Sequence, residues 1–281
     1  MTGCLCLDAT FKNLQSLVNS NCKLNEDQLL LVLDLAKETI SKQSLLKEGI
    51  IALIQLQMMV AEQAEASGNI PANQVAIFAR SYFDLSSMIL LKENYKSLKN
   101  AKNLEYHVAY LIAANERFGL TMAQSLDLSQ DNCSAVRIHN KGSISIVGKF
   151  KQFCFELRES FPDNETTTEG KSISDSITLT SKALEYFRAS KGISLTWTVY
   201  EDIASLMPTD MTIHTQKIFN HSKITVNSRV IGLELDPPLP SNTSEELGIL
   251  NFEMISPNRD KKLKTLCAFY NYEYSEYVIS Y

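Results

Sequence analysis

The spacing of apolar residues divides this chain into a part with a helical period and a part with a strand period. Between residues 24 and 126, apolar side chains return every three or four positions, which places them on one face of an α-helix. The first such face is formed by Leu29, Val32, Leu33, Ala36 and Ile40. Asn25 can cap the start of this helix, and acidic residues follow directly after it.

Three more helices are predicted by the same spacing. The stretch "LLKEGIIALIQLQMMVAEQAEAS" ends at "SGN", and Pro71 then suits the first turn of a third helix that begins "PANQVAIFARSYF". A fourth stretch, "LEYHVAYLIAANERFGLTMAQSL", places Val108, Leu111, Ile112 and Phe118 on its apolar face. Short connections predict antiparallel packing of these helices around a common core.

Near residue 128 the spacing at which apolar residues recur changes from 3.6 residues to 2 residues, and a spacing of 2 is typical of strands. In "SLTWTVY", Leu195, Trp197 and Val199 alternate with polar residues, and "GSISIVGKF" and "GILNFEM" alternate in the same way. Turn-rich segments such as "SFPDNETTTEG" separate these stretches, so an antiparallel β-sandwich is predicted. The expected fold class is α+β, with a lead segment at 1–24, a helical subdomain at 25–128 and a β-sandwich subdomain at 129–281.

Composition narrows the class of protein. Hydrophobic residues make up 44% and charged residues 21%, which is ordinary for a protein with a packed core. The net charge of -5 gives no basic signal for nucleic acid. We see no signal peptide and no apolar run of the ~18 residues that a membrane helix needs. Two readings remain open, a cytosolic protein or a fragment of a longer secreted or membrane protein.

Cysteines and glycosylation signals bear on the cellular compartment. The six cysteines are Cys4, Cys6, Cys22, Cys133, Cys154 and Cys267. Their spacing does not match a zinc-binding motif. Two interpretations remain open, namely that the cysteines are scattered buried thiols or that they form one or two disulfides. Four Asn-X-Ser/Thr sequons, at Asn132, Asn164, Asn220 and Asn242, lie in polar, loop-like sequence and favour a secretory route.

Two arrangements could suggest catalysis. Ser44 and Lys47 match the Ser-x-x-Lys nucleophile pattern, but they lie in an amphipathic helical stretch without the supporting motifs. Glu201 and Asp202 are adjacent carboxylates, which do not face each other on a strand or a helix, so we expect both to be solvated. Neither arrangement predicts an enzyme.

The four histidines give no better case for chemistry. His214 and His221 are seven residues apart and have no Cys or acidic third ligand nearby, so a metal site is not predicted. His107 and His139 stand alone in the sequence and are interpreted as structural residues. Residues 1–281 therefore predict no cofactor, no metal and no catalytic residue.

The second half of the chain follows a characteristic order of elements. A strand ending at Tyr200 leads to a short helical turn in "EDIASLM", then to a strand in "VNSRVIGLEL", a Pro-rich loop, a strand in "ILNFEM", a charged turn and the aromatic segment "LCAFYNYEYSEY". This order resembles the GAIN domain (GPCR autoproteolysis-inducing domain) of adhesion receptors and polycystin-like proteins. The segment from Cys267 is similar to the start of the family's proteolysis-site motif, with Phe269 in place and Tyr270 where the family has Trp.

The resemblance also has a limit. In the family the motif continues to Trp, Gly-Cys and a His-Leu-Ser/Thr tripeptide, where the hydroxyl attacks the preceding peptide bond with the His as base. No such tripeptide occurs in residues 1–281, so self-cleavage is not expected within this sequence. The strand that serves the family as tethered agonist, and the usual disulfide partner of Cys267, are not found in it either.

The resemblance implies a non-enzymatic extracellular module with a structural or regulatory role in receptor signalling and cell adhesion. It would be a disulfide-containing glycoprotein on the outer side of the plasma membrane, or secreted. Expected partners are the receptor's own C-terminal strand and transmembrane region, and extracellular protein ligands. The alternative is an intracellular helical adaptor with an accessory β domain, which glycosylation at Asn164 or Asn242 would exclude.

Overall fold

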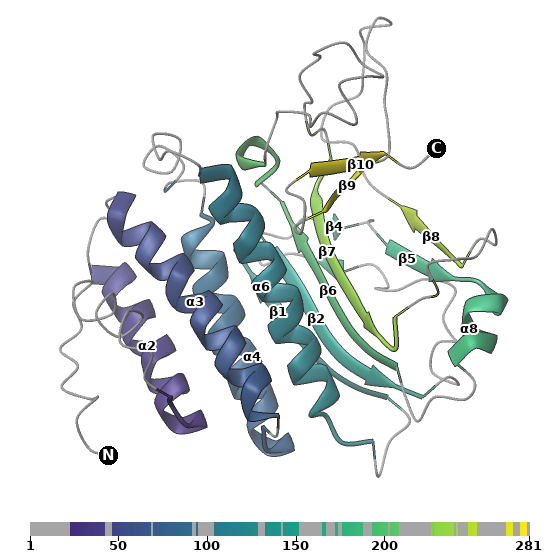
Figure 1. The fold of residues 1–281 in the computed structure, drawn as a ribbon, viewed down its shortest axis with the longest axis horizontal. Coiled ribbons are helices and arrows are strands. Elements are labelled where there is room, and N and C mark those ends of the chain that lie inside the picture. Colours follow the sequence, from purple (N-terminus) through teal and green to yellow (C-terminus); the bar gives the residue numbers. More distant parts are fainter. Residues whose placement is uncertain are drawn as a thin grey trace, which may run out of the picture.

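The computed structural model describes helices packed on one side of an antiparallel sheet (Figure 1). The described residues are 23–42, 47–68, 70–91, 104–128, 133–141, 143–151, 165–166, 172–173, 176–187, 193–201, 203–207, 228–238, 247–251, 268–271 and 276–279, with residues 94, 226 and 240. Within them the α+β class predicted from the sequence is confirmed, with helices first and strands afterwards.

Four long helices form the first part of the described chain. They are α2 (Glu26–Lys42), α3 (Lys47–Ser67), α4 (Ala72–Ile89) and α6 (Leu104–Gln124). The predicted cap of α2 is confirmed, because the Gln28 backbone N–H donates to Asn25 Oδ1 at 3.0 Å and the Asn25 N–H donates to Gln28 Oε1 at 3.1 Å. Helix α3 ends at Ser67, and the next residue, Gly68, has a φ of 68°, the left-handed conformation that is common directly after a helix.

Four strands form the main sheet, in the order β1-β2-β6-β7, and every pair is antiparallel. Their bounds are β1 (Cys133–Asn140), β2 (Ser143–Phe150), β6 (Ile193–Tyr200) and β7 (Val230–Asp236). The central row of the register joins Val147 to Thr196 and Thr196 to Glu234. Immediately after β6, the predicted helical turn is present as the 3-10 helix η2 (Ile203–Leu206).

Shorter elements complete the described structure. They are β3 (Glu165–Thr166), β4 (Ser172–Ile173), β5 (Ser176–Leu179), α8 (Ser181–Phe187), β8 (Gly248–Asn251), β9 (Ala268–Asn271) and β10 (Glu276–Ile279). The strands form the pairs β3–β4, β5–β8 and β9–β10. Figure 1 shows β5, β8 and α8 on the side of the main sheet opposite the helices. The β-sandwich stays a prediction, since the described strands show one four-stranded sheet and three separate pairs.

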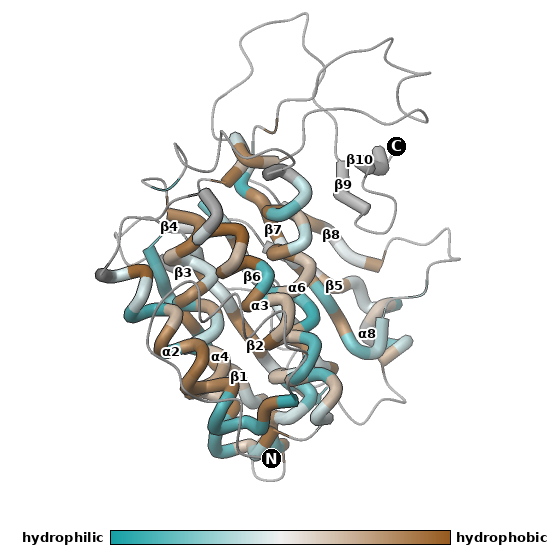
Figure 2. The backbone as a smooth tube through the Cα atoms, turned by 60° about the vertical axis from the view of Figure 1, so that its left-hand side comes forward, coloured by the Kyte–Doolittle hydropathy of each residue, from teal (hydrophilic) through white to brown (hydrophobic). Residues whose placement is uncertain are grey.

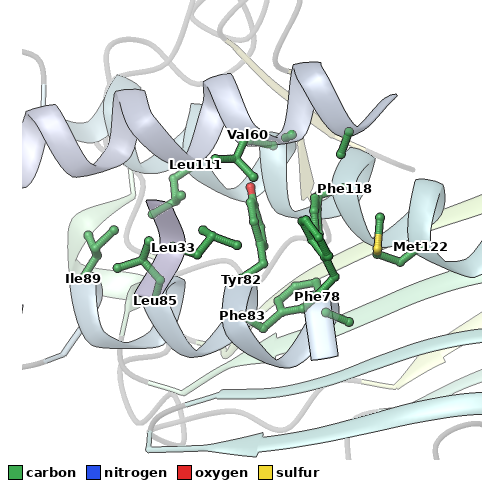
Figure 3. Packing of buried hydrophobic residues seen from close by; sticks show 14 of the residues in the cluster. Leu33, Val60, Phe78, Tyr82, Phe83, Leu85, Ile89, Leu111, Phe118 and Met122 are labelled. Atoms are coloured by element: carbon green, nitrogen blue, oxygen red, sulfur yellow. The ribbon is translucent and has the colours of Figure 1, made fainter. Parts of the chain in front are cut away.

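Buried residues form two clusters, one on each face of the sheet. The larger cluster joins all four helices to sheet residues such as Val136, Val147 and Tyr200. Its aromatic centre is Phe118, whose ring stacks on Tyr82 at a centroid distance of 3.7 Å (Figure 3). Figure 2 shows hydrophobic and hydrophilic stretches alternating along the helices, as expected of elements that bury one face.

The second cluster lies on the opposite face of the sheet. It contains the alternating apolar residues predicted from β2 and β6, including Ile146, Leu195 and Trp197, together with Ala183 and Phe187 of α8. The sequence alternation in β6 is therefore confirmed as a division between two faces. Leu250 of β8, expected on an apolar face, is 45% exposed in the structure.

Candidate functional site

Helix α6 meets the sheet over residues that are small or polar. In β6 the odd positions Leu195 and Trp197 belong to the cluster on the far face, so Thr196 and Thr198 face the helices. Both threonines are buried, and Thr198 Oγ1 donates to Ser145 Oγ of β2 at 3.1 Å. A polar sheet face can be buried only where its hydroxyls are hydrogen-bonded or tightly packed.

Two glycines lie where α6 comes close to the sheet. A Cβ added to Gly119 of α6 would lie 2.4 Å from Thr196 Cγ2 and 2.5 Å from Thr196 Oγ1. A Cβ added to Gly232 of β7 would lie 2.8 Å from Glu116 Oε1 of α6. The Thr196 distances are shorter than any ordinary carbon contact, so α6 can lie this close to β6 only because Gly119 lacks a side chain, whereas the Glu116 carboxyl group could move aside from a Cβ at position 232.

A buried amide connects three elements at this interface. Asn115 Nδ2 of α6 lies 2.6 Å from the Tyr200 hydroxyl oxygen of β6 and 2.7 Å from Ser86 Oγ of α4, and donates a hydrogen bond to each. All three residues are buried. Burial raises the pKa of the Tyr200 phenol, so this group stays neutral and hydrogen-bonded. The amide therefore fixes the position of α4 and α6 relative to the end of β6.

A carboxyl group lies beside this amide on the next position of α6. The Leu233 backbone N–H of β7 donates to the Glu116 carboxyl group, which is partly buried between α6 and β7. Burial and, to a lesser degree, the negative charge of Glu234 raise the pKa of Glu116 to about 8. Glu116 is therefore largely protonated at neutral pH, and α6 contacts β7 through a neutral carboxyl group.

Polar contacts continue along α6 at the surface. Arg117 Nη2 lies 3.1 Å from Glu65 Oε2 of α3, in an exposed ion pair that contributes little to stability. Gln124 Nε2 donates to Asp236 Oδ2 of β7 at 2.9 Å, and Lys149 Nζ of β2 donates to the Gln124 backbone carbonyl at 2.8 Å. Helix α6 is thus hydrogen-bonded to the sheet at positions between Asn115 and Gln124, its last residue.

The protonated carboxyl group gives a testable pH dependence. The folded state keeps the proton of Glu116 up to about pH 8, whereas its ordinary pKa is 4.5. Between these values the unfolded chain binds fewer protons, so the contribution of Glu116 to the free energy of unfolding falls as pH rises. The variant Glu116→Gln should remove this slope and gain at least about 1 kcal/mol at pH 8, roughly the equivalent of one pKa unit.

Urea unfolding at pH 5 and pH 8 measures this effect, with Glu185→Gln, at an exposed position of α8, as the matched control. The expected result is a wild-type protein that loses stability between pH 5 and 8 relative to Glu116→Gln, while Glu185→Gln follows the wild type. A Glu116→Gln variant with the wild-type pH slope would show that this carboxyl group ionises normally.

The motif and sequon residues predicted from the sequence do not contribute to this interface within the described residues. Phe269 and Tyr270 belong to β9, where the backbone of Phe269 pairs with Val278 and that of Tyr270 pairs with Tyr277 of β10. Cys267 and the four sequon residues Asn132, Asn164, Asn220 and Asn242 lie outside the described residues. Their roles stay predictions.

The residues weighed for catalysis are not brought together among the described residues. Lys47 is the first residue of α3, and His107 and His139 lie on α6 and β1. Ser44, Asp202, His214 and His221 lie outside the described residues. The expected solvation of Glu201 is wrong, since Glu201 is only 7% exposed. It directly follows β6, where the helices and η2 cover the end of the strand.

Asn115, Glu116 and Gly119 were missed by sequence reasoning, although one signal was present. Asn115 follows Leu111 and Ile112 at helical spacing and precedes Phe118, so it lies on the buried face of its helix. An amide in that position needs a partner from another element. Nothing in the sequence indicated that the partner would be Tyr200, 85 residues later.

The fold and this interface define an α+β module in which a helical layer is fixed to an antiparallel sheet. Family comparison gives a more specific result. The profile of the GAIN subdomain B family (GPS) matches residues 124–277, more than half of the chain. The chain belongs to this family, which confirms the resemblance drawn from its motifs.

Solved structures agree with this fold. The full extracellular region of zebrafish Gpr126/Adgrg6 is similar with a TM-score of 0.56 over 93% of this chain, at 11% sequence identity. The match covers 32% of that chain, so the present sequence spans about a third of its length. At this identity the likeness concerns the fold, including its helical layer. Comparison with curated proteins gives no match.

No described helix is both long and apolar enough to cross a membrane.

Proposed function

We propose that this chain is a non-enzymatic extracellular module of an adhesion receptor, with a structural or regulatory role in signalling and adhesion. The family match over residues 124–277 supports this proposal, as does the similarity to the extracellular region of Gpr126/Adgrg6. The alternative of an intracellular adaptor has no comparable support. It is kept as an outcome of the experiments below.

The observation that carries the proposal is the fixation of the helical layer to the sheet by α6. The larger apolar cluster runs without interruption from α2 to the sheet, and Asn115 adds hydrogen bonds to α4 and β6. A module built in this way resists separation of its two layers. That property suits a domain that holds a receptor segment in place and transmits to it a mechanical force or the effect of a ligand bound at the domain's surface.

Two further features favour an oxidising, secretory environment. We propose that Cys133, the first residue of β1, forms a disulfide bond. Disulfides of this kind persist mainly outside the cytosol. The four sequons are compatible with the same route, and we propose that at least one of them carries a glycan.

We propose that the module does not cleave itself within residues 1–281. The His-Leu-Ser/Thr tripeptide that supplies the base and the nucleophile in the family does not occur in these residues. We propose instead that its partners are the receptor's own C-terminal strand and transmembrane region. Ligands would be extracellular proteins.

A receptor assay tests the regulatory role. In cells that express the full-length gene product, Gly119→Val should change basal signalling at equal surface abundance, because the added side chain forces α6 away from Thr196. Tyr110→Val, on the exposed side of the same helix, is the control and should leave signalling unchanged. Identical signalling by both variants, once the Gly119→Val protein is shown to be loosened, would contradict a regulatory role for the module.

A further inference from the structure

Strand β7 is the last strand of the main sheet, and one of its two sides is open within the described part of the chain. Among the described strands the order is β1-β2-β6-β7, and β7 pairs with β6. The pairing follows one unbroken register from Val230 to Asp236, without a bulge. The strand sequence, "VIGLELD", contains neither Pro nor Lys, two residues that commonly keep a further strand from pairing with a sheet edge. A side chain from another element can supply this protection instead.

The register shows to which side of β7 the Leu233 backbone points. In an antiparallel pair, the N–H and C=O groups of one residue point either to the partner strand together or away from it together. Leu233 lies opposite Trp197 of β6, yet its N–H donates to the Glu116 carboxyl group. The N–H and C=O groups of Leu233 therefore point away from β6, to the open side of β7.

Glu116 reaches this open side from α6 by passing over Gly232. A Cβ added at position 232 would lie 2.8 Å from Glu116 Oε1, so the carboxyl group lies directly against the Gly232 backbone. Both the neutral and the ionised carboxyl group offer an acceptor oxygen, so the contact with the Leu233 N–H does not require one protonation state. Leu233 is the central residue of β7, and Glu116 thus covers the middle of the edge.

Without this cover, β7 is suited to pair with β7 of a second copy of the chain. Ile231, Leu233 and Leu235 pack against the apolar cluster on the far face of the sheet, and a second β7 would continue that apolar face. Antiparallel pairing centred on Leu233 would place Glu234 opposite Gly232 of the copy, so like charges would not lie directly opposite each other. Such a pair is two-fold symmetric and closes as a dimer.

We propose that Glu116 caps the open edge of β7 through the Leu233 N–H, and that this contact prevents β7 from pairing with β7 of a second copy. Charged side chains and elements that cover a sheet edge serve this purpose in many proteins, because an uncovered edge presents unpaired backbone groups. The cap belongs to this chain's own fold and does not depend on the receptor role proposed above.

Hydrogen exchange of residues 1–281, resolved to single amides and measured at a dilution where each variant is monomeric, tests the cap. In Glu116→Ala the Leu233 amide should exchange at least about tenfold faster than in the wild type, because its acceptor is lost. In Glu116→Gln it should keep the wild-type protection, since the side-chain carbonyl of Gln is also an acceptor. The Gly232 and Glu234 amides point to β6 and should be unchanged in both variants.

Sedimentation velocity tests the consequence of losing the cap. At high protein concentration Glu116→Ala should form a dimer in which the Leu233 amide is protected again, whereas the wild type and Glu116→Gln stay monomeric. Glu185→Ala, at an exposed position of α8, removes a carboxyl group elsewhere and should behave as the wild type. Circular dichroism confirms that each variant keeps the fold.

The proposal would be overturned by a Leu233 amide whose exchange does not respond to Glu116→Ala. A Glu116→Ala variant that stays monomeric, or that forms species larger than a dimer, would overturn it as well. So would a dimer that the wild type forms to the same extent.

Discussion

Phe118→Ala should lower the free energy of unfolding by about 3–5 kcal/mol, the range found when a buried Phe is truncated to Ala. Phe118 is fully buried, stacks on Tyr82 at 3.7 Å and has its ring within 6.3 Å of those of Phe78 and Phe83. Figure 3 shows these rings together, between α4 and α6. The truncation leaves a cavity that the surrounding helices and the sheet cannot easily fill.

Urea unfolding followed by far-ultraviolet circular dichroism measures this loss. The control is Tyr110→Ala, two turns earlier on α6, where the side chain is 42% exposed and a change within about 0.5 kcal/mol is expected. If the two variants were equally stable, Phe118 would not lie at the centre of the packed core.

Gly119→Ala should destabilise the protein, although the same substitution in an ordinary helix is stabilising. Ala exceeds Gly in helix propensity by about 1 kcal/mol, which favours the variant. The added Cβ would however lie 2.4 Å from Thr196 Cγ2, and Thr196 is held in the buried strand β6. Overpacking of this kind typically costs about 1–3 kcal/mol, and both α6 and β6 resist movement, so we expect the clash to dominate.

A double-mutant cycle separates these two effects. In Gly119→Ala/Thr196→Ala only the Thr196 Cβ remains close, at 3.0 Å, so the double variant should be more stable than the sum of the single changes by about 1 kcal/mol. A Gly119→Ala protein more stable than the wild type would mean that α6 does not approach the sheet as closely as described.

The elements of this fold were predictable where one residue pattern determines them. The stripe beginning at Leu29 and the cap at Asn25 predict α2, and the alternation around Trp197 predicts β6 and its two faces. In these cases the geometry of a helix or a strand and the burial of one of its faces determine the spacing of apolar residues along a continuous stretch of chain. That spacing can therefore be recognised in the sequence itself.

The interface of α6 was not predictable in the same way. Thr196 and Thr198 look like the solvent face of a strand, because serine and threonine are mostly exposed in proteins. They are buried because Gly119 lets α6 lie directly on them, and this depends on residues 77 or more positions apart. Glu201 is predicted to be solvated because adjacent carboxylates do not face each other, but the sequence does not show that the end of β6 will be covered, and Glu201 is buried.

The central claim is that this chain is an extracellular receptor module, and its modifications in the cells that produce it test this most directly. Mass spectrometry of the native protein, digested without reduction, determines whether Asn164 or Asn242 carries a glycan and whether Cys133 is disulfide-bonded. The account predicts a glycan on at least one of these sequons and an oxidised Cys133. A native protein with unmodified sequons and a free Cys133 thiol would contradict it and favour an intracellular adaptor.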